Sequence, residues 1–148
     1  MPTVETLDRT YLDMARIWSK LSRAERMKVG CLIVKNDMII SDGYNGTPAG
    51  FDNTCEGEDG KTLKEVLHAE SNAINNSFQS LSGSKMYVTL EPCNHYGKTP
   101  PCTKNIIKKG ISEIFYSIDD IDKRVKGKSY KILSKKKIKV KKGLLKNE

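Results

Sequence analysis

The stretch KMYVTLEPCNHYGKTPPC, residues 85–102, runs from a predicted strand through a loop to the start of a predicted helix, and it is the part of the sequence that decides the fold. The β-rich run 85–90 predicts a strand, and the loop after it contains two cysteines and a Pro-Pro pair. A proline suits the first turn of a helix, so we expect a helix from Pro101 to Lys109 that ends at Gly110. The stretch therefore predicts a strand, a loop and a helix, with a cysteine at each end of the loop.

Helical and β-rich segments alternate on both sides of this unit. Apolar periodicity predicts further helices over residues 4–21, 63–78 and 128–133, and β-rich runs predict strands over 28–34, 38–41, 113–117 and 138–140. The polar turn 35–37 has hairpin length, so the first two strands are expected to pair antiparallel. Residues 42–62 predict a long loop, and long loops in compact domains are usually functional.

This order of elements predicts the α/β class, with a mixed five-stranded sheet covered on both faces, a three-layer α/β/α domain. A chain of 148 residues suits a single domain spanning 1–148. In the first helix, the residues at helical spacing that we expect to rest on the core are Leu7, Tyr11, Met14, Ile17, Trp18 and Leu21.

Charge and cysteine content narrow the function classes. Lys and Arg number 26 against 18 Asp and Glu, and the net charge of +8 favours a polyanionic partner such as a nucleotide. Much of the excess lies in residues 123–146, where a solvated face is the simpler interpretation, so we do not expect nucleic-acid binding. No leader or membrane span is recognisable, which predicts a cytoplasmic protein whose four cysteines are poor disulfide candidates. Metal binding is the better explanation for suitably spaced cysteines.

The chemistry is concentrated in four residues. His68 and Glu70 form an H-x-E pair, and Cys93 and Cys102 follow at the two ends of the loop. Zinc accepts imidazole nitrogen and thiolate sulfur in tetrahedral geometry, and three protein ligands leave the fourth position for water. Zinc lowers the pKa of that water, and a neighbouring carboxylate can move its proton. The pattern predicts a catalytic zinc site with Glu70 as the acid–base group, as in zinc deaminases.

The identity of the third ligand is open on this reasoning. Eight residues separate Cys93 from Cys102, a longer gap than in the zinc-deaminase signature, so His95 could replace Cys102. A histidine two residues after Cys93 has an awkward reach, and we favour Cys102. The other cysteines have other interpretations: Cys31 is expected to be a small buried hydrophobe in a strand, and the role of Cys55 is undecided.

At these residues the sequence resembles the cytidine and deoxycytidylate deaminase superfamily. The segments KVG at 28–30, GYNGTPAGF at 43–51 and HAESNAI at 68–74 are similar to deoxycytidylate (dCMP) deaminases. The resemblance implies hydrolytic deamination of dCMP to dUMP, which supplies dUMP for dTMP synthesis, by a zinc enzyme with a cytidine-deaminase-like fold. It also implies a hexamer that is activated by dCTP and inhibited by dTTP, and Mg²⁺ could accompany the triphosphate.

By matching position, the resemblance also implies substrate and effector residues. Asn45 is expected to hydrogen-bond the deoxyribose, with Ala69 and Thr47 as further substrate contacts. Arg26 is the expected partner of the 5′-phosphate, with Lys28 and Arg23 as alternatives. The regulatory nucleotide is expected at Gly43, Tyr44, Asn45 and Gly46. The aromatic side chain that stacks on the base could be Tyr96, Phe115 or Tyr116.

The second half of the chain is similar to another branch of the superfamily. Residues 87–102 and 122–143 resemble the deaminase domain of riboflavin biosynthesis, which has the same long spacing between its cysteines and so supports Cys102 as a ligand. That branch supplies the alternative function, deamination of diaminohydroxyphosphoribosylaminopyrimidine. About twenty residues between the second strand and His68 favour dCMP, because the riboflavin-type domain is expected to have a short approach there. A nucleic-acid-editing deaminase and a structural zinc module are weaker alternatives.

Overall fold

The computed structural model describes residues 2–25, 27–47, 55, 57–59, 67–93, 101–118 and 126–144. The helices are α1 (Val4–Ser19), α2 (Ala69–Asn75), α3 (Cys102–Lys108) and α4 (Lys128–Lys135). The strands are β1 (Gly30–Lys35), β2 (Met38–Tyr44), β3 (Lys85–Leu90), β4 (Glu113–Ile118) and β5 (Lys139–Lys142). Each of these elements corresponds to a segment that periodicity predicts.

The five strands form one mixed sheet in the order β2-β1-β3-β4-β5. Strand β1 pairs antiparallel with both β2 and β3, whereas β3, β4 and β5 are parallel. The predicted hairpin is confirmed, since Lys35 pairs with Met38 across a turn in which Asn36 and Asp37 have φ of 52° and 62°. Asparagine and aspartate tolerate such left-handed conformations, which match the twist of a two-residue hairpin.

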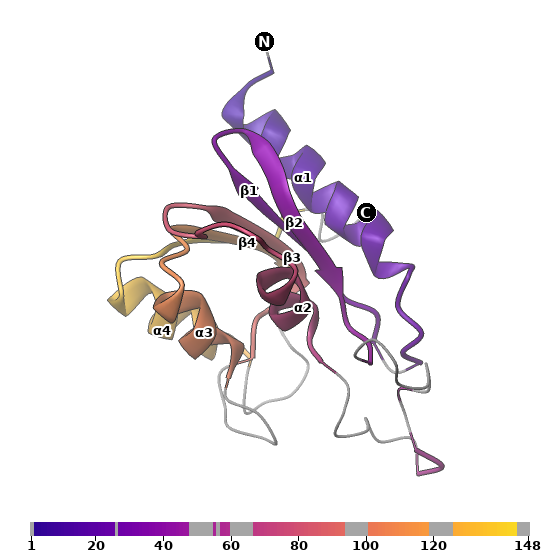
Figure 1. Ribbon diagram of the computed structural model, residues 1–148. Coiled ribbons are helices and arrows are strands. Elements are labelled where there is room, and N and C mark those ends of the chain that lie inside the picture. The colour runs from indigo at the N-terminus through magenta and orange to yellow at the C-terminus, as the bar shows by residue number, and fades with distance from the viewer. Residues whose placement is uncertain are drawn as a thin grey trace.

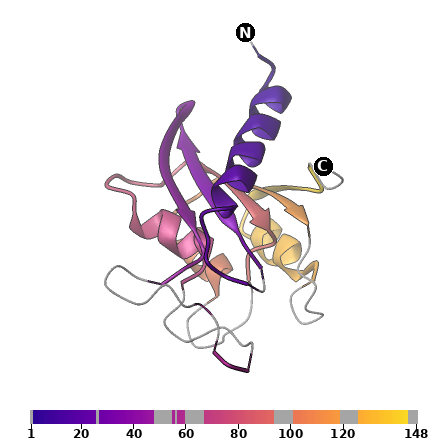
Figure 2. The same cartoon turned by 90° about the vertical axis from the view of Figure 1, so that its right-hand side faces the viewer.

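Helices cover both faces of the sheet, which confirms the predicted three layers (Figures 1 and 2). Helix α1 lies on one face, where Leu12 and Ala15 pack against Leu32, Tyr87 and Phe115. Helices α2, α3 and α4 lie on the other face, over a larger cluster that includes Ala69, Ala73, Cys102, Ile106 and Leu133 together with Cys31, Met86, Val88 and Tyr116.

The predicted buried face of α1 is wrong for four of its six residues, whereas Tyr11 packs against the core cluster as predicted. The buried side chains are Asp8, Leu12 and Ala15, whereas four members of the predicted stripe are exposed: Met14 (38%), Ile17 (53%), Trp18 (37%) and Leu21 (50%). The reason is close backbone packing, because a Cβ atom at Gly30 would lie 1.9 Å from the carbonyl oxygen of Ala15. At so short a distance the helix must present a small residue to the strand.

Two predicted boundaries next to the long loop are also wrong. Strand β2 continues beyond Ser41 to Tyr44, since Gly43 pairs with Cys31 and Tyr44 with Gly30. Helix α2 begins at Ala69, so His68 is its N-cap residue and not an interior position. These corrections bring the end of β2 and the start of α2 together, where Gly46 and Leu67 form an isolated antiparallel bridge.

Within the part of the chain that the structure describes, none of the helices combines the length and the apolar character that a bilayer crossing requires.

Candidate metal centre

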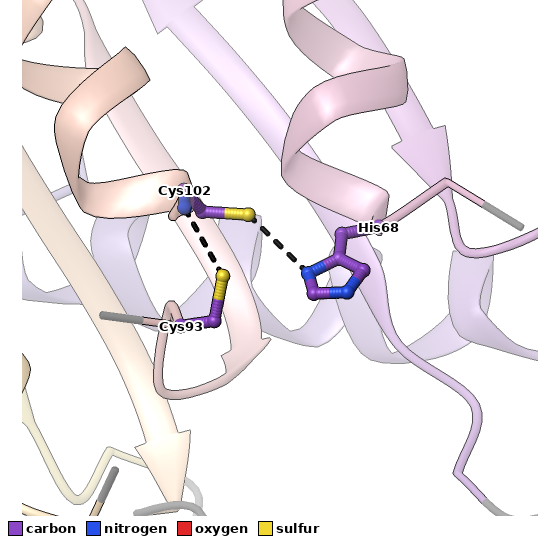
Figure 3. A group of neighbouring side chains, drawn as sticks. All are labelled: His68, Cys93 and Cys102. Carbon is purple, nitrogen blue, oxygen red and sulfur yellow. Dashed lines mark hydrogen bonds between the residues drawn. The ribbon is translucent and has the colours of Figure 1, made fainter. Parts of the chain in front are cut away.

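Three elements bring one potential metal ligand each to the same point (Figure 3). His68 is the N-cap residue of α2, Cys93 lies just beyond the end of β3, and Cys102 is the first residue of α3. Their ligand atoms all lie within 4.8 Å of one another. The structure therefore brings together the three residues that the sequence predicts as zinc ligands. The alternative ligand His95 lies outside the described residues.

Hydrogen bonds from the start of α3 hold the two cysteines in place. The backbone N–H of Cys102 donates to Sγ of Cys93 at 3.0 Å, and the N–H of Thr103 donates to the Cys93 carbonyl oxygen at 3.1 Å. On the other side, Sγ of Cys102 lies 3.4 Å from Nδ1 of His68. The first turn of a helix has N–H groups without intrahelical partners, and here they bind the residue that precedes the loop.

The surroundings of the two thiols shift their pKa values in opposite directions. The pKa of Cys93 is lowered to about 4, chiefly because the Cys102 thiol donates a hydrogen bond to it and despite its partial burial. The pKa of Cys102 is raised well above its ordinary value, first by its hydrogen bond to Cys93 and then by burial. One thiolate is therefore already present near neutral pH, in the form that a metal requires.

The donor set fits zinc. One imidazole nitrogen and two thiolate sulfurs are borderline-soft ligands of the kind zinc prefers. Tetrahedral coordination at zinc's usual bond lengths places neighbouring ligand atoms about 3.3–3.8 Å apart. The distance of 3.4 Å between Sγ of Cys102 and Nδ1 of His68 falls in this range. Among the described residues, three side chains form the cluster, and three protein ligands with one open position are the arrangement of a catalytic and not of a structural zinc site.

Glu70 lies beside this cluster and is 4% exposed. Burial raises the pKa of its carboxyl group, and the neighbouring His68 opposes this shift. The carboxylate also interacts with the Cys102 thiol. A buried carboxyl group with a raised pKa next to a metal site is suited both to accept and to donate a proton.

Helix α2, which carries Glu70, is fixed to the edge strand β2. A Cβ atom at Gly43 would lie 2.5 Å from the nitrogen of Ala73, so the two backbones are in direct contact. The Ser41 hydroxyl donates to the Ala73 carbonyl oxygen, and the amides of Asn72 and Asn76 donate to β2 carbonyl oxygens. Gly43, which the sequence assigns to a nucleotide site, therefore also has a packing role.

The predicted substrate residues differ in how deeply they are buried. Asn45 is half-buried, and its amide bonds the backbone: Oδ1 accepts from the N–H of Val29 at 2.8 Å and Nδ2 donates to the Met27 carbonyl oxygen at 2.8 Å. Ala69 is fully buried at the start of α2, and Thr47 is half-buried. Arg26 lies outside the described residues, and the alternatives Arg23 and Lys28 are exposed.

Two of the three aromatic residues that could stack on the base, Phe115 and Tyr116, lie on opposite faces of the sheet. Phe115 stacks on Tyr87 with ring centroids 4.6 Å apart, under α1 and on the face of the sheet away from the metal cluster. Tyr116 is fully buried in the core on the metal side. Tyr96 lies outside the described residues.

Of the other two cysteines, Cys31 is fully buried as predicted, and Cys55 is 2% exposed and packs against Ala24.

Sequence reasoning missed Glu91, which is 2% exposed and precedes Pro92 and Cys93 in the loop. Its carboxylate binds backbone N–H groups of Gly127 and Ser129, residues far away in the sequence. The sequence shows a glutamate between a β-rich run and a Pro-Cys pair. No local pattern in the sequence indicates which backbone N–H groups its carboxylate binds.

Comparisons with known proteins identify a family and several relatives of this chain. Residues 5–118 match the family described as the cytidine and deoxycytidylate deaminase zinc-binding region. The chain is 40% identical over 144 residues to the diaminohydroxyphosphoribosylamino-pyrimidine deaminase of Buchnera aphidicola subsp. Schizaphis graminum, covering 95% of this chain and 87% of that protein. It is 38% identical over 120 residues to the riboflavin biosynthesis protein RibD of Actinobacillus pleuropneumoniae, covering 81% of this chain and only 28% of that protein.

Solved structures give the same two groups of relatives. The dCMP deaminase of the cyanophage S-TIM5, in complex with dCMP and dUMP, is 34% identical with a TM-score of 0.83, over 96% of this chain and 99% of that chain. RibD of Acinetobacter baumannii is 28% identical with a TM-score of 0.80, over 98% of this chain and 37% of that chain.

Proposed function

Because the chain belongs to the family of cytidine and deoxycytidylate deaminases with a zinc-binding region, we propose that it hydrolyses dCMP to dUMP and ammonia. The single observation that carries this proposal is the arrangement of His68, Cys93 and Cys102 around one point, with the buried carboxyl group of Glu70 beside them. An open ligand position next to a proton carrier is what hydrolytic removal of an amino group from a pyrimidine requires.

His68, Cys93 and Cys102 would hold the zinc ion, which when bound supplies a Lewis acid that makes water a nucleophile at neutral pH. Glu70 holds and moves the protons. Its raised pKa suits the carboxyl group to two transfers: it takes a proton from the attacking water and gives it to the ring nitrogen, and then takes the proton of the newly added hydroxyl group and gives it to the amine, which leaves as ammonia. Its burial keeps bulk water from competing for that proton.

The choice of dCMP rests on the segment between β2 and α2. Gly46 and Leu67, which are described, pair with each other next to His68. The run GYNGTP at 43–48, which opens the segment, is similar to dCMP deaminases and therefore favours a deoxynucleotide substrate. The end-to-end likeness to a dCMP deaminase, with its TM-score of 0.83, supports the same choice.

Asn45 and Thr47 lie where this segment begins, and we keep both as proposed sugar contacts. The Asn45 amide has one N–H and one acceptor lone pair beyond the two backbone bonds described above, so a sugar hydroxyl could still bind there. Ala69 at the start of α2 and Arg26 remain proposed contacts of the base and the 5′-phosphate.

Regulation and assembly are also proposals. Of the four residues proposed for the effector, Tyr44 is 38% exposed, and a Cβ atom added at Gly46 would make an ordinary van der Waals contact, 3.9 Å from the Tyr44 ring. A dCTP or dTTP molecule, with Mg²⁺ on its phosphates, would bind at Gly43, Tyr44, Asn45 and Gly46 in a hexamer.

A second candidate function is deamination of the riboflavin-pathway pyrimidine ribosyl phosphate. Two observations favour it: the long gap between Cys93 and Cys102, and the 40% identity to the Buchnera deaminase over most of both chains. The same ligands and Glu70 would serve this reaction, because both substrates carry an amino group on a pyrimidine ring.

One experiment tests both candidates. Purified protein of measured zinc content is assayed for ammonia release with dCMP, CMP, cytidine and the riboflavin intermediate, each with and without dCTP and Mg²⁺. We expect dCMP to give the highest kcat/KM. Turnover of the riboflavin intermediate alone would overturn the first candidate in favour of the second.

A further inference from the structure

Helix α4 begins without a cap of its own. Its N-cap residue is Gly127, in the left-handed conformation with φ of 75°, and it provides no side-chain hydrogen bond to the first turn. The first turn contains no acidic residue, and its first residue is the cation Lys128. The positive end of the helix dipole and a lysine therefore coincide, so an anion from elsewhere in the chain would be stabilising here.

Glu91 supplies that anion from the metal loop. Its Oε1 accepts from the N–H of Gly127 at 2.9 Å, and its Oε2 accepts from the N–H of Ser129 at 3.0 Å. Both Glu91 and Ser129 are almost completely buried. Hydrogen bonds from backbone N–H groups to a carboxylate are among the stronger ones in proteins, and burial protects them from solvent screening.

The contact is reciprocal. The hydroxyl of Ser129 donates to the carbonyl oxygen of Pro92, and the N–H of Glu91 donates to the carbonyl oxygen of Ile118 at the end of β4, at 2.9 Å. The segment before Cys93 is thus bound to both β4 and α4. It resembles a capping box in which the two partners lie more than 35 residues apart in the sequence.

Cys93 is consequently held from both sides. The residues before it are bound by α4 through Glu91 and Pro92, and its own carbonyl oxygen and sulfur accept N–H groups of Thr103 and Cys102 at the start of α3. A metal ligand on a loop needs such support, because small displacements of its sulfur weaken coordination.

We propose that Glu91 is a positioning residue of the metal centre, which fixes Cys93 for zinc by binding the start of α4. The inference rests on the metal site of the proposed function but not on its substrate. It gives the C-terminal helix, which contributes no metal ligand, a role in zinc affinity.

The experiment compares two buried carboxylates replaced by their isosteric amides. Glu91→Gln places an amide N–H₂ against a backbone N–H, and Asp8→Asn is the matched control on the opposite face of the sheet. Asp8 is 3% exposed and accepts a hydrogen bond from the Tyr87 hydroxyl. The zinc dissociation constant of each purified variant is measured by competition with a chromogenic chelator, at a temperature where circular dichroism shows it folded.

We expect Glu91→Gln to bind zinc about 10- to 100-fold more weakly than the wild type, and Asp8→Asn to bind it with unchanged affinity. Unchanged affinity in Glu91→Gln, or an equal loss in Asp8→Asn, would overturn the proposal, since the effect would then be absent or a general result of destabilisation. If Glu91→Gln does not fold, Ser129→Ala takes its place, because it removes the hydroxyl that binds the Pro92 carbonyl oxygen and keeps the backbone N–H that binds Glu91.

For Ser129→Ala, weaker zinc binding supports the proposal and wild-type affinity overturns it. The zinc measurement is independent of the deaminase assay. A wild-type protein that fails to deaminate dCMP but shows Glu91-dependent zinc affinity would therefore contradict the substrate assignment and not this inference.

Discussion

A Cβ atom at Gly43 would lie 2.5 Å from the backbone nitrogen of Ala73 and 2.7 Å from the carbonyl oxygen of Ala69. The edge strand β2 and the helix that carries Glu70 are therefore in backbone contact, and any side chain at residue 43 must displace the helix. The position of Glu70 relative to the metal ligands depends on this contact.

Gly43→Ala is expected to lower the free energy of unfolding by about 1–3 kcal/mol, the usual cost of inserting atoms into a packed interface. Chemical denaturation monitored by circular dichroism measures it. Gly46→Ala is the control, because a Cβ atom added at that residue would lie 3.9 Å from its nearest neighbour. Equal losses in the two variants would show that the contact with α2 is not the cause.

Glu70→Gln is expected to retain zinc while kcat for dCMP falls by roughly 10²- to 10⁴-fold, the range that a general acid–base group contributes. The amide preserves the shape of the buried side chain but cannot carry the proton. Zinc content by atomic absorption and initial rates of ammonia release check the two halves of the expectation. Retained turnover would remove Glu70 from the mechanism.

Cys102→Ser is expected to lose most of the bound zinc, since it replaces one of the three proposed zinc ligands. The control is Cys31→Ala, which removes a buried thiol that lies outside this ligand cluster in the strand β1. Zinc stoichiometry after gel filtration distinguishes the two. If Cys102→Ser kept full stoichiometry, the ligand set would have to include another residue, and His95 would be tested next.

Asn45→Ala is expected to lower the free energy of unfolding by about 1–3 kcal/mol, because it removes both backbone hydrogen bonds of the amide and leaves the N–H of Val29 without that partner. Asn76→Ala provides the comparison, since its amide makes one exposed bond to the Asp42 carbonyl oxygen. We expect a change within about 0.5 kcal/mol for that variant.

A role for Asn45 in sugar binding predicts more than lost stability. At a temperature where Asn45→Ala is fully folded, KM for dCMP should rise while zinc content stays constant. An unchanged KM would limit Asn45 to its structural role.

In the zinc-free protein, Cys93 is expected to be alkylated by iodoacetamide at pH 6 faster than Cys102. The pKa of Cys93 is lowered to about 4, mainly by the hydrogen bond from the Cys102 thiol, so it is a thiolate at that pH. Its folded-state pKa lies below the value of about 8.5 for an unfolded chain, so its stabilising contribution is present at alkaline pH and is lost as the pH falls toward 4.

Peptide mapping by mass spectrometry at several pH values measures the two rates. Cys102→Ala removes the donor, which should raise the pKa of Cys93 and slow its alkylation at pH 6. Equal reactivity of Cys93 in both proteins at pH 6 would contradict this account.

The resemblance to the superfamily, together with the riboflavin-type loop, is confirmed by the family match and by the structural relatives. The mixed five-stranded sheet is confirmed as well. These features could be predicted because they depend on local patterns. Alternation and helical periodicity identify strands and helices one at a time, and zinc chemistry restricts ligands to a few residue types.

Features that depend on how elements pack could not be predicted in this way. The stripe of Met14, Ile17 and Trp18 has the spacing of a core face, yet α1 rests on the sheet through Leu12 and Ala15. Gly30 lacks a Cβ and admits the helix backbone so closely that only a small residue fits opposite. Helical periodicity describes a helix by itself and contains no information about the surface that it meets.

By itself, the sequence determined which residue types could bind a metal, His68, Cys93 and Cys102, and which carboxyl group accompanies them, Glu70. Only the tertiary structure decided that these ligand atoms lie within 4.8 Å of one another. It also decided that the backbone of Gly43 lies directly against the backbone of α2, and that Glu91 caps a helix more than 35 residues later in the chain. Residue chemistry is local, whereas distances between residues far apart in the sequence are fixed by the packing of the whole chain.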